Sequence, residues 1–273
     1  MIPEDAFTLH RPGGLTIRGE TYAEDEKPRR SVVICHGFKG FSHWGFFPHL
    51  ARAIASAGMR AITFDFSGSG MGDDRETFVD ADAFGKNTFT QELADLDAVI
   101  EEARRRDWIS SPYGLLGHSR GGGVAILHAA ANEDVKALTT WAAISYVTRW
   151  TPSDVITWRE RGFVDIVNAR TGQVMQLGTS LLDDVEAHHG STLDIAAAAS
   201  RIRVPWLILH GNEDETVPRV EGERLHELSR GSSTLRILST NHGFGAKHPF
   251  DDVPESLSTA IRETLNFFEQ YLD

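Results

Sequence analysis

Short apolar runs alternate with helical patterns along most of this chain, and this alternation limits the possible folds more than any other feature. The runs are rich in β-branched residues and span 32–35, 61–64, 114–116, 137–144, 205–209 and 235–238. Continuous apolar runs of this length are typical of strands covered on both faces. Between them, apolar residues recur at helical spacing, as at Leu93, Leu96 and Ile100. Thr88 with Gln91 predicts a capping box at the start of this helix. The pattern predicts an α/β fold with a mainly parallel sheet and helices on both faces.

Two segments depart from the alternation. Residues 7–22 predict an antiparallel hairpin that turns at Gly13-Gly14 and adds two edge strands, giving an eight-stranded sheet. No convincing sheet strand lies between residue 144 and about residue 204, where a second hairpin is predicted from 163–167 and 173–177, turning at 168–172. This stretch is longer than an ordinary connection. We therefore expect one domain over residues 1–273, with residues 146–200 inserted as a lid or cap.

Composition limits the kinds of partner and the cell compartment that we expect for this chain. The net charge of −12 argues against nucleic acid or an anionic membrane surface as partner, because both would be repelled. The first residues show no basic region followed by an apolar run, so we expect no signal peptide and a cytoplasmic protein. The single cysteine, Cys35, cannot form an internal disulfide and is predicted to be buried as a small apolar residue.

The segment Gly117-His118-Ser119-Arg120-Gly121 follows one of the predicted strands and precedes an apolar, helix-like stretch over 124–131. A serine on such a sharp strand-to-helix turn needs glycines two residues away, because the backbones there pass close together. The turn also places the hydroxyl near a helix N-terminus, where a developing anion is favoured. The pattern alone could be a glycine-rich structural turn. The strand before it and the helix after it favour Ser119 as a nucleophile.

A serine nucleophile needs a base and an orienting carboxylate, expected later in the chain in the order acid, then histidine. His242 follows the last predicted strand and is the expected base, with His248 as the other nearby histidine. The acid lies after the strand at 205–209, where Glu213, Asp214 and Glu215 are adjacent. Both loops stand at the carboxyl ends of strands, where such sheets place their sites.

An oxyanion hole needs backbone N–H groups aimed at the carbonyl oxygen as it becomes negative. One is expected from Arg120, the residue after the nucleophile. The other is expected from the loop that follows the strand at 32–35, which reads His36-Gly37-Phe38, and Phe38 is our choice.

Across nearly its whole length the sequence resembles the α/β-hydrolase superfamily. The matching motifs are His36-Gly37-Phe38, Asp65-Phe66-Ser67-Gly68-Ser69-Gly70, Gly117-His118-Ser119-Arg120-Gly121, His210-Gly211-Asn212-Glu213-Asp214 with Val217-Pro218, and Asn241-His242-Gly243-Phe244. Within the superfamily the layout is similar to small bacterial carboxylesterases of the cinnamoyl/feruloyl esterase group, although those usually have glutamine where Arg120 stands. The resemblance implies a Ser119, Asp214 and His242 triad, a Phe38 and Arg120 oxyanion hole, and an insertion that roofs the pocket.

The resulting hypothesis is a serine carboxylesterase that cleaves a small-molecule ester with a small acyl or aromatic part through an acyl-enzyme. No cofactor is expected and no metal site, because the adjacent His188-His189 point in different directions. Peptide, thioester and carbon–carbon bond hydrolysis use the same triad and stay open, as does a non-catalytic ligand-binding protein. A homodimer is compatible with the sequence. Four residues either line an apolar pocket or pack the insertion onto the body: Trp150, Trp158, Phe163 and Met175.

Overall fold

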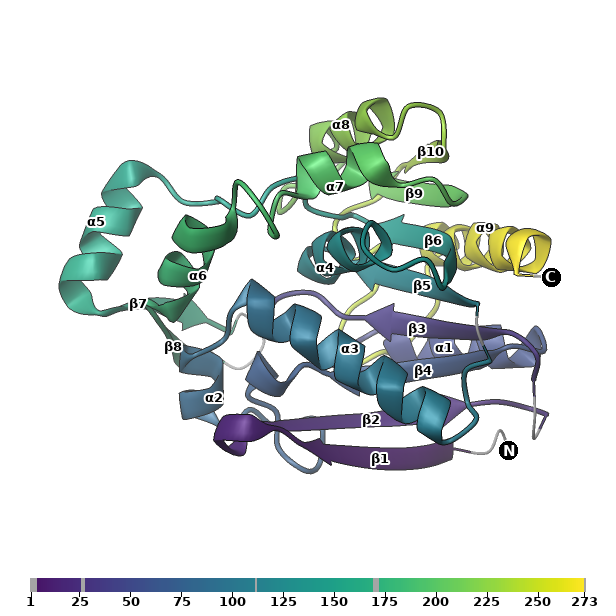
Figure 1. Ribbon diagram of the computed structural model, residues 1–273, viewed down its shortest axis with the longest axis horizontal. Helices are drawn as coiled ribbons and strands as arrows, with labels where there is room; N and C mark the ends of the chain where they lie inside the picture. The colour runs from purple at the N-terminus through teal and green to yellow at the C-terminus, as the bar shows by residue number, and fades with distance from the viewer. Residues whose placement is uncertain (1–3, 26–27, 111, 169–171, 273) are drawn as a thin grey trace.

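The computed structural model describes residues 4–25, 28–110, 112–168 and 172–272. Within these ranges eight strands form one sheet in the order β1-β2-β4-β3-β5-β6-β9-β10 (Figure 1). They are β1 Glu4–His10, β2 Thr16–Tyr22, β3 Ser31–Cys35, β4 Arg60–Asp65, β5 Tyr113–His118, β6 Val135–Trp141, β9 Trp206–Gly211 and β10 Ser233–Leu238. β2 pairs antiparallel with β1 and β4, and the remaining pairs are parallel. The predicted eight-stranded, mainly parallel sheet is confirmed.

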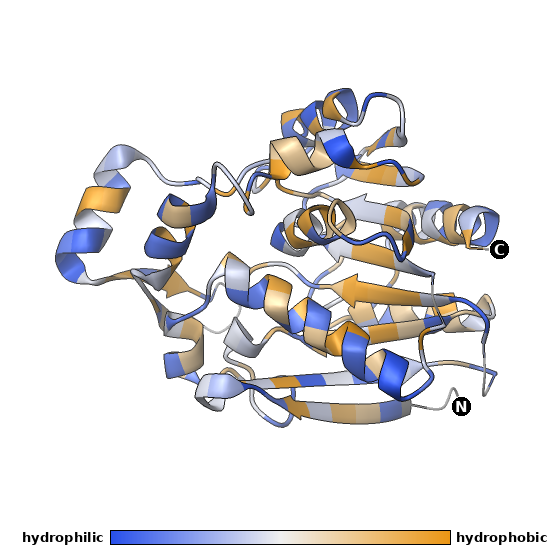
Figure 2. Cartoon of the chain, viewed as in Figure 1, coloured by the Kyte–Doolittle hydropathy of each residue, from blue (hydrophilic) through white to orange (hydrophobic). Residues whose placement is uncertain are grey.

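The central strands are apolar throughout because both faces of the sheet are covered. Every residue of β3 is buried. Since side chains alternate along a strand, Val33 and Cys35 join one core while Val32 and Ile34 join the other. The first core lies under α3 Phe89–Arg105, α4 Arg120–Ala129, α7 Ile195–Arg201 and α8 Val220–Leu228, and the second under α1 Phe47–Ser56 and α9 Glu255–Tyr271. Figure 2 shows the apolar central strands between helices whose outer faces are hydrophilic.

Two local predictions need correction. The run at 137–144 is not all strand, because β6 ends at Trp141 and Ala142 takes a left-handed φ of 47°. Thr88 caps α3 by accepting from the backbone N–H of Gln91, as expected for half of a capping box. The other half is missing, since the Gln91 side chain donates to Asp95 instead.

The inserted segment between β6 and β9 contains α5 Pro152–Arg161, β7 Phe163–Val167, β8 Val174–Gly178 and α6 Ser180–His188. β7 and β8 form the predicted antiparallel hairpin. Of the turn predicted at 168–172, residues 169–171 lie outside the described residues. Figure 1 shows the insertion projecting from the end of the sheet at which β3 finishes. There β8 contacts the short helix α2 Ala81–Gly85, so the insertion lies at the edge where a site is expected.

Candidate active site

Ser119 stands on a strained turn between β5 and α4. Its backbone adopts φ 56° and ψ −122°, a conformation that a residue with a side chain rarely takes. The surrounding backbone holds it there. The N–H of Ser119 donates to the carbonyl of Trp141 at 2.9 Å, and the N–H of Ile144 donates to the carbonyl of Ser119 at 3.3 Å. The end of β6 and the residues just after it therefore hold the backbone of the serine in place.

The two glycines of the motif are required by close backbone contacts. A Cβ atom on Gly117 would overlap the carbonyl oxygen of Gly121, and one on Gly121 would overlap the carbonyl oxygen of His36. Neither overlap can be relieved by a side-chain rotation, because both neighbours are backbone atoms. The structure thus shows the steric reason that the sequence pattern indicated, namely that the backbone passes too close to both glycines for a side chain to fit.

The structure brings Ser119, His242 and Asp214 together. His242 Nε2 lies 3.0 Å from Ser119 Oγ, and His242 Nδ1 lies 2.7 Å from Asp214 Oδ2. Because a carboxylate only accepts, the Nδ1–H of His242 donates to Asp214 and leaves Nε2 free to accept from the serine hydroxyl. His242 comes from the loop after β10, and Asp214 from the loop after β9.

The side chain of Asp214 is fully buried but well supplied with donors. Its Oδ1 accepts from the backbone N–H groups of Thr216 at 2.9 Å and Val217 at 2.8 Å. Burial alone would raise the pKa of Asp214, but the hydrogen bond and charge of His242 and the Val217 bond outweigh it and lower the pKa. Asp214 is therefore an ionised acceptor. Its neighbours Glu213 and Glu215 are exposed.

His118, which the sequence did not single out, lies directly against the candidate base. Its ring centroid is 4.7 Å from that of His242, and its Nε2–H donates to the backbone carbonyl of His242 at 3.0 Å. Burial, reinforced by the neighbouring His242, lowers the pKa of His118 to about 3. A neutral His118 thus ties the His242 loop to β5 without placing a second positive charge beside the base. Nothing in the sequence pattern distinguishes it from a core histidine.

Phe38 and Arg120 are the two residues whose backbone amides are predicted to form an oxyanion hole. Phe38 lies in the loop after β3, and Arg120 is the first residue of α4, so its N–H has no acceptor within the helix. The Arg120 side chain turns into the protein. There it pairs with buried Glu92 at 2.8 Å and lies over the Phe89 ring at 3.9 Å and the Phe38 ring at 5.2 Å. The side chains of the two predicted amide donors therefore pack against each other.

A buried polar network holds the loop that carries Phe38. Asp65 Oδ1 accepts from the backbone N–H of Ser42 at 2.6 Å, and Asp65 Oδ2 pairs with Arg75 at 3.1 Å. Arg75 also pairs with Glu20 at 2.7 Å. Burial alone would raise the pKa of Glu20, but hydrogen bonds from His43 and Tyr22 and the charge of Arg75 lower it to about 2. No single sequence pattern predicts this network, because its members come from four separate segments.

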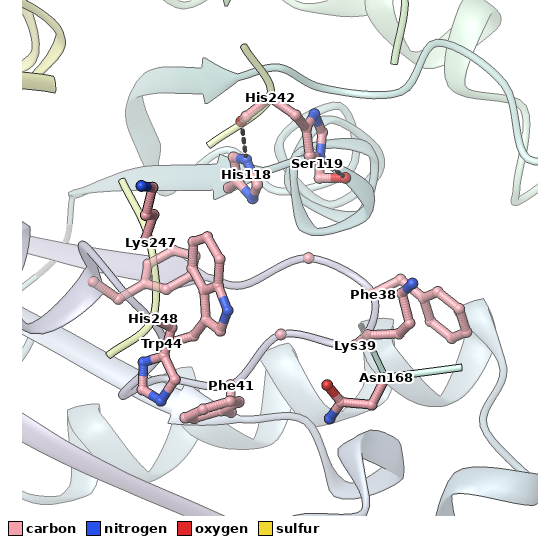
Figure 3. Close-up of a pocket in the computed structure, with 13 residues that line it drawn as sticks. Phe38, Lys39, Phe41, Trp44, His118, Ser119, Asn168, His242, Lys247 and His248 are labelled. Atoms are coloured by element: carbon pink, nitrogen blue, oxygen red, sulfur yellow. Dashed lines mark hydrogen bonds between the residues drawn. The ribbon is translucent and has the colours of Figure 1, made fainter. Parts of the chain in front are cut away.

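A cavity of about 440 Å³ opens beside Ser119 and His242. Figure 3 shows Ser119, His118 and His242 together on one side of it. Its apolar walls are Phe38, Phe41, Trp44 and Phe47, and its remaining lining comes from Gly37, Lys39, Gly40, Asn168, Lys247 and His248. His248 accepts from the backbone N–H of Gly45 at 3.0 Å, whereas it is His242 that lies within hydrogen-bonding distance of Ser119 Oγ.

The aromatic residues of the insertion do not line this cavity. Trp158 is buried, donates its indole N–H to the carbonyl of Leu177 at 3.0 Å and packs against Trp150. Met175 is also buried, while Phe163 is half-buried. The packing interpretation of these residues is therefore the better one. The insertion contributes Asn168, at the end of β7, to the cavity instead.

The described part of the chain contains neither a metal-binding cluster nor a membrane-spanning helix. No group of three or more His, Cys, Asp or Glu side chains is placed to hold a metal ion there. His188 instead pairs with Asp184 on its own helix at 3.2 Å. Among the same residues, no helix combines the length and apolar character needed to cross a bilayer. Cys35 is buried, and burial raises the pKa of its thiol.

Comparison with known proteins decides the family. The model of the hydrolase family described as "Serine aminopeptidase, S33" matches residues 26–169, more than half of the chain. The chain belongs to this family. The hydrolase is thus an enzyme of the α/β-hydrolase type, as the resemblance implied.

Two individual proteins are also similar to this chain, each at less than 30% sequence identity. The hydrolase is 25% identical over 240 residues to a monoacylglycerol lipase of Mycolicibacterium smegmatis. The alignment covers 78% of this chain and 80% of that protein. It is 28% identical over 195 residues to 2,6-dihydropseudooxynicotine hydrolase of Paenarthrobacter nicotinovorans, covering 70% of this chain but only 46% of that protein.

Among solved structures, Est1E from Butyrivibrio proteoclasticus with bound ferulic acid superimposes with a TM-score of 0.73. The superposition covers 97% of this chain and 98% of that chain at 18% identity. At this identity the likeness shows the fold alone. It confirms the α/β-hydrolase fold that the sequence predicted.

Proposed function

We propose that this hydrolase is a serine carboxylesterase. Ser119 Oγ attacks the ester carbonyl carbon while His242 Nε2 accepts its proton, and Asp214 stabilises the imidazolium that forms. The amides of Phe38 and Arg120 donate to the oxyanion. Collapse of the tetrahedral intermediate breaks the bond to the alcohol oxygen, which takes the proton from His242. Water then attacks the acyl-enzyme with His242 again as base, and the carboxylic acid leaves.

The observation that carries this proposal is the pair of contacts on His242. Its two ring nitrogens lie 3.0 Å from Ser119 Oγ and 2.7 Å from Asp214 Oδ2, within hydrogen-bonding distance on both sides. The strained φ of 56° at Ser119 adds support, because strain of this kind is kept where the surroundings force it and is frequent at active sites.

We also propose that residues 146–200 act as a lid within a single domain. Two contacts of the inserted segment support this proposal. Asn168, at the end of β7, lines the cavity beside Ser119, while β8 rests on α2. Such a lid would limit the size of the acyl or alcohol group.

The cavity favours ester over aminopeptidase activity. An aminopeptidase must recognise the free α-ammonium group of its substrate, which calls for a carboxylate in the binding pocket. Among the residues that the structure describes, none of those lining the cavity is Asp or Glu. Its aromatic walls suit the apolar part of an ester, and similarity to a monoacylglycerol lipase and to Est1E, whose structure holds ferulic acid, supports this.

The two activities can be separated with paired chromogenic substrates. We expect saturable hydrolysis of 4-nitrophenyl butyrate and at least about 100-fold lower kcat/KM on leucine and proline 4-nitroanilides, a difference that corresponds to about 2.7 kcal/mol. Steady-state kinetics on the same enzyme preparation measures both. Faster cleavage of either anilide than of the ester would contradict the esterase proposal and support an aminopeptidase.

A further inference from the structure

Two lysines are among the residues that line the cavity beside Ser119. Lys39 follows Phe38 in the loop after β3, and Lys247 lies in the loop that follows His242. The whole chain has five lysines and a net charge of −12, yet two of the five line this one cavity. Figure 3 places Lys39 and Lys247 on opposite sides of the hollow that faces Ser119.

Neither ammonium group has a carboxylate partner among the described residues. Lys86, by contrast, directly follows α2 and pairs with Asp82 of that helix at 2.7 Å. Glu76 lies near this wall, but it pairs with His248 at 3.2 Å. Both cavity lysines are exposed at the mouth, so their charges are available to a group that arrives from solvent.

The backbone of Lys39 strengthens the argument. Its φ is 62°, a left-handed conformation in which glycine is favoured and a long side chain is uncommon. Gly40 follows directly and does not take a positive φ. Strain at a residue that lines a pocket is an indication of a functional role. Lys39, whose ammonium group has no carboxylate partner among the described residues, therefore stands next in sequence to Phe38, whose backbone amide is a proposed oxyanion donor.

We propose that the preferred substrate is an ester that carries a second, anionic group, which Lys39 and Lys247 attract while the aromatic walls contact its apolar body. The inference rests on the proposed esterase function. A chain of net charge −12 repels anions at long range, so a local pair of cations is needed to bring such a substrate to Ser119. The anionic group takes no part in the bonds that break.

The test compares anionic esters with neutral carboxamide counterparts. On the acyl side the pair is 4-nitrophenyl hemiadipate and 4-nitrophenyl adipamate, and on the alcohol side it is 4-carboxyphenyl and 4-carbamoylphenyl butyrate. We expect a kcat/KM at least about 5-fold higher for the anionic member of one pair at low ionic strength. The advantage should shrink in 0.5 M NaCl, because salt screens exposed charges.

Variants then assign the effect to the lysines. Lys39→Gln and Lys247→Gln should each reduce the anionic-to-neutral ratio of kcat/KM by about 2- to 5-fold, and the double variant should abolish the preference. Lys86→Gln, an exposed lysine outside the cavity, is the matched control and should keep it. A neutral member that is faster in both pairs, or a preference that survives in the double variant, would overturn the inference. Absence of Ser119-dependent hydrolysis of any ester would instead overturn the proposed function.

Discussion

Replacing Ser119 by alanine should lower kcat for 4-nitrophenyl butyrate by about 10⁶-fold, the scale seen when a triad serine is lost. The fold should survive the change. Within the described residues, the hydroxyl makes its one hydrogen bond with His242, and Ser119 caps α4 without a side-chain bond. Removing Oγ therefore removes the proposed nucleophile and little else. Initial rates, corrected with blanks that contain no enzyme, measure the loss of kcat.

Two comparisons sharpen this result. Ser191→Ala removes an exposed hydroxyl in the insertion and should leave kcat within about 2-fold. The double variant Ser119→Ala with His242→Ala should be no slower than Ser119→Ala alone, because residues that act as a unit are not additive. If Ser119→Ala retained more than about 1% of the wild-type kcat, another nucleophile would have to be sought.

Asp214→Asn should lower kcat by about 10⁴-fold, because the histidine would lose the acceptor that holds it in the reactive tautomer. Asparagine keeps an Oδ1 able to accept from the N–H groups of Thr216 and Val217, so the loop should keep its shape. Circular dichroism checks the fold, and the kinetics are measured on the same ester.

The neighbouring acids provide the controls for Asp214. Glu213→Gln and Glu215→Gln remove the same charge from exposed positions of the same loop and should change kcat by less than about 2-fold. A loss at either position comparable with that of Asp214→Asn would contradict the choice of acid.

Much of the site could be predicted because its residues stand at ends of strands. Ser119, Asp214 and His242 each follow an apolar run, and parallel strands bring their carboxyl ends to one edge. The glycines around Ser119 were informative for the same reason, since a sharp turn permits few residue types. Local sequence was enough wherever backbone geometry alone decided the outcome.

Side-chain direction was not predictable in the same way. Trp158 could have faced the cavity or the interior of the insertion, and only the tertiary contact with Leu177 decides between them. Glu92 sits on a helix whose pattern reads as amphipathic, yet it is buried because Arg120, 28 residues later, reaches it. Lys39 and Lys247 are ordinary loop lysines in the sequence and share one cavity only in the fold.

The most direct measurement is covalent labelling with a fluorophosphonate probe, followed by peptide mass spectrometry. The probe reacts with a serine only when a base activates the hydroxyl. We predict stoichiometric modification of Ser119 in the wild-type protein, and none in Ser119→Ala or in folded His242→Ala. Failure of the folded wild-type protein to label, or labelling of a serine other than Ser119, would contradict the central claim that Ser119 is the activated nucleophile.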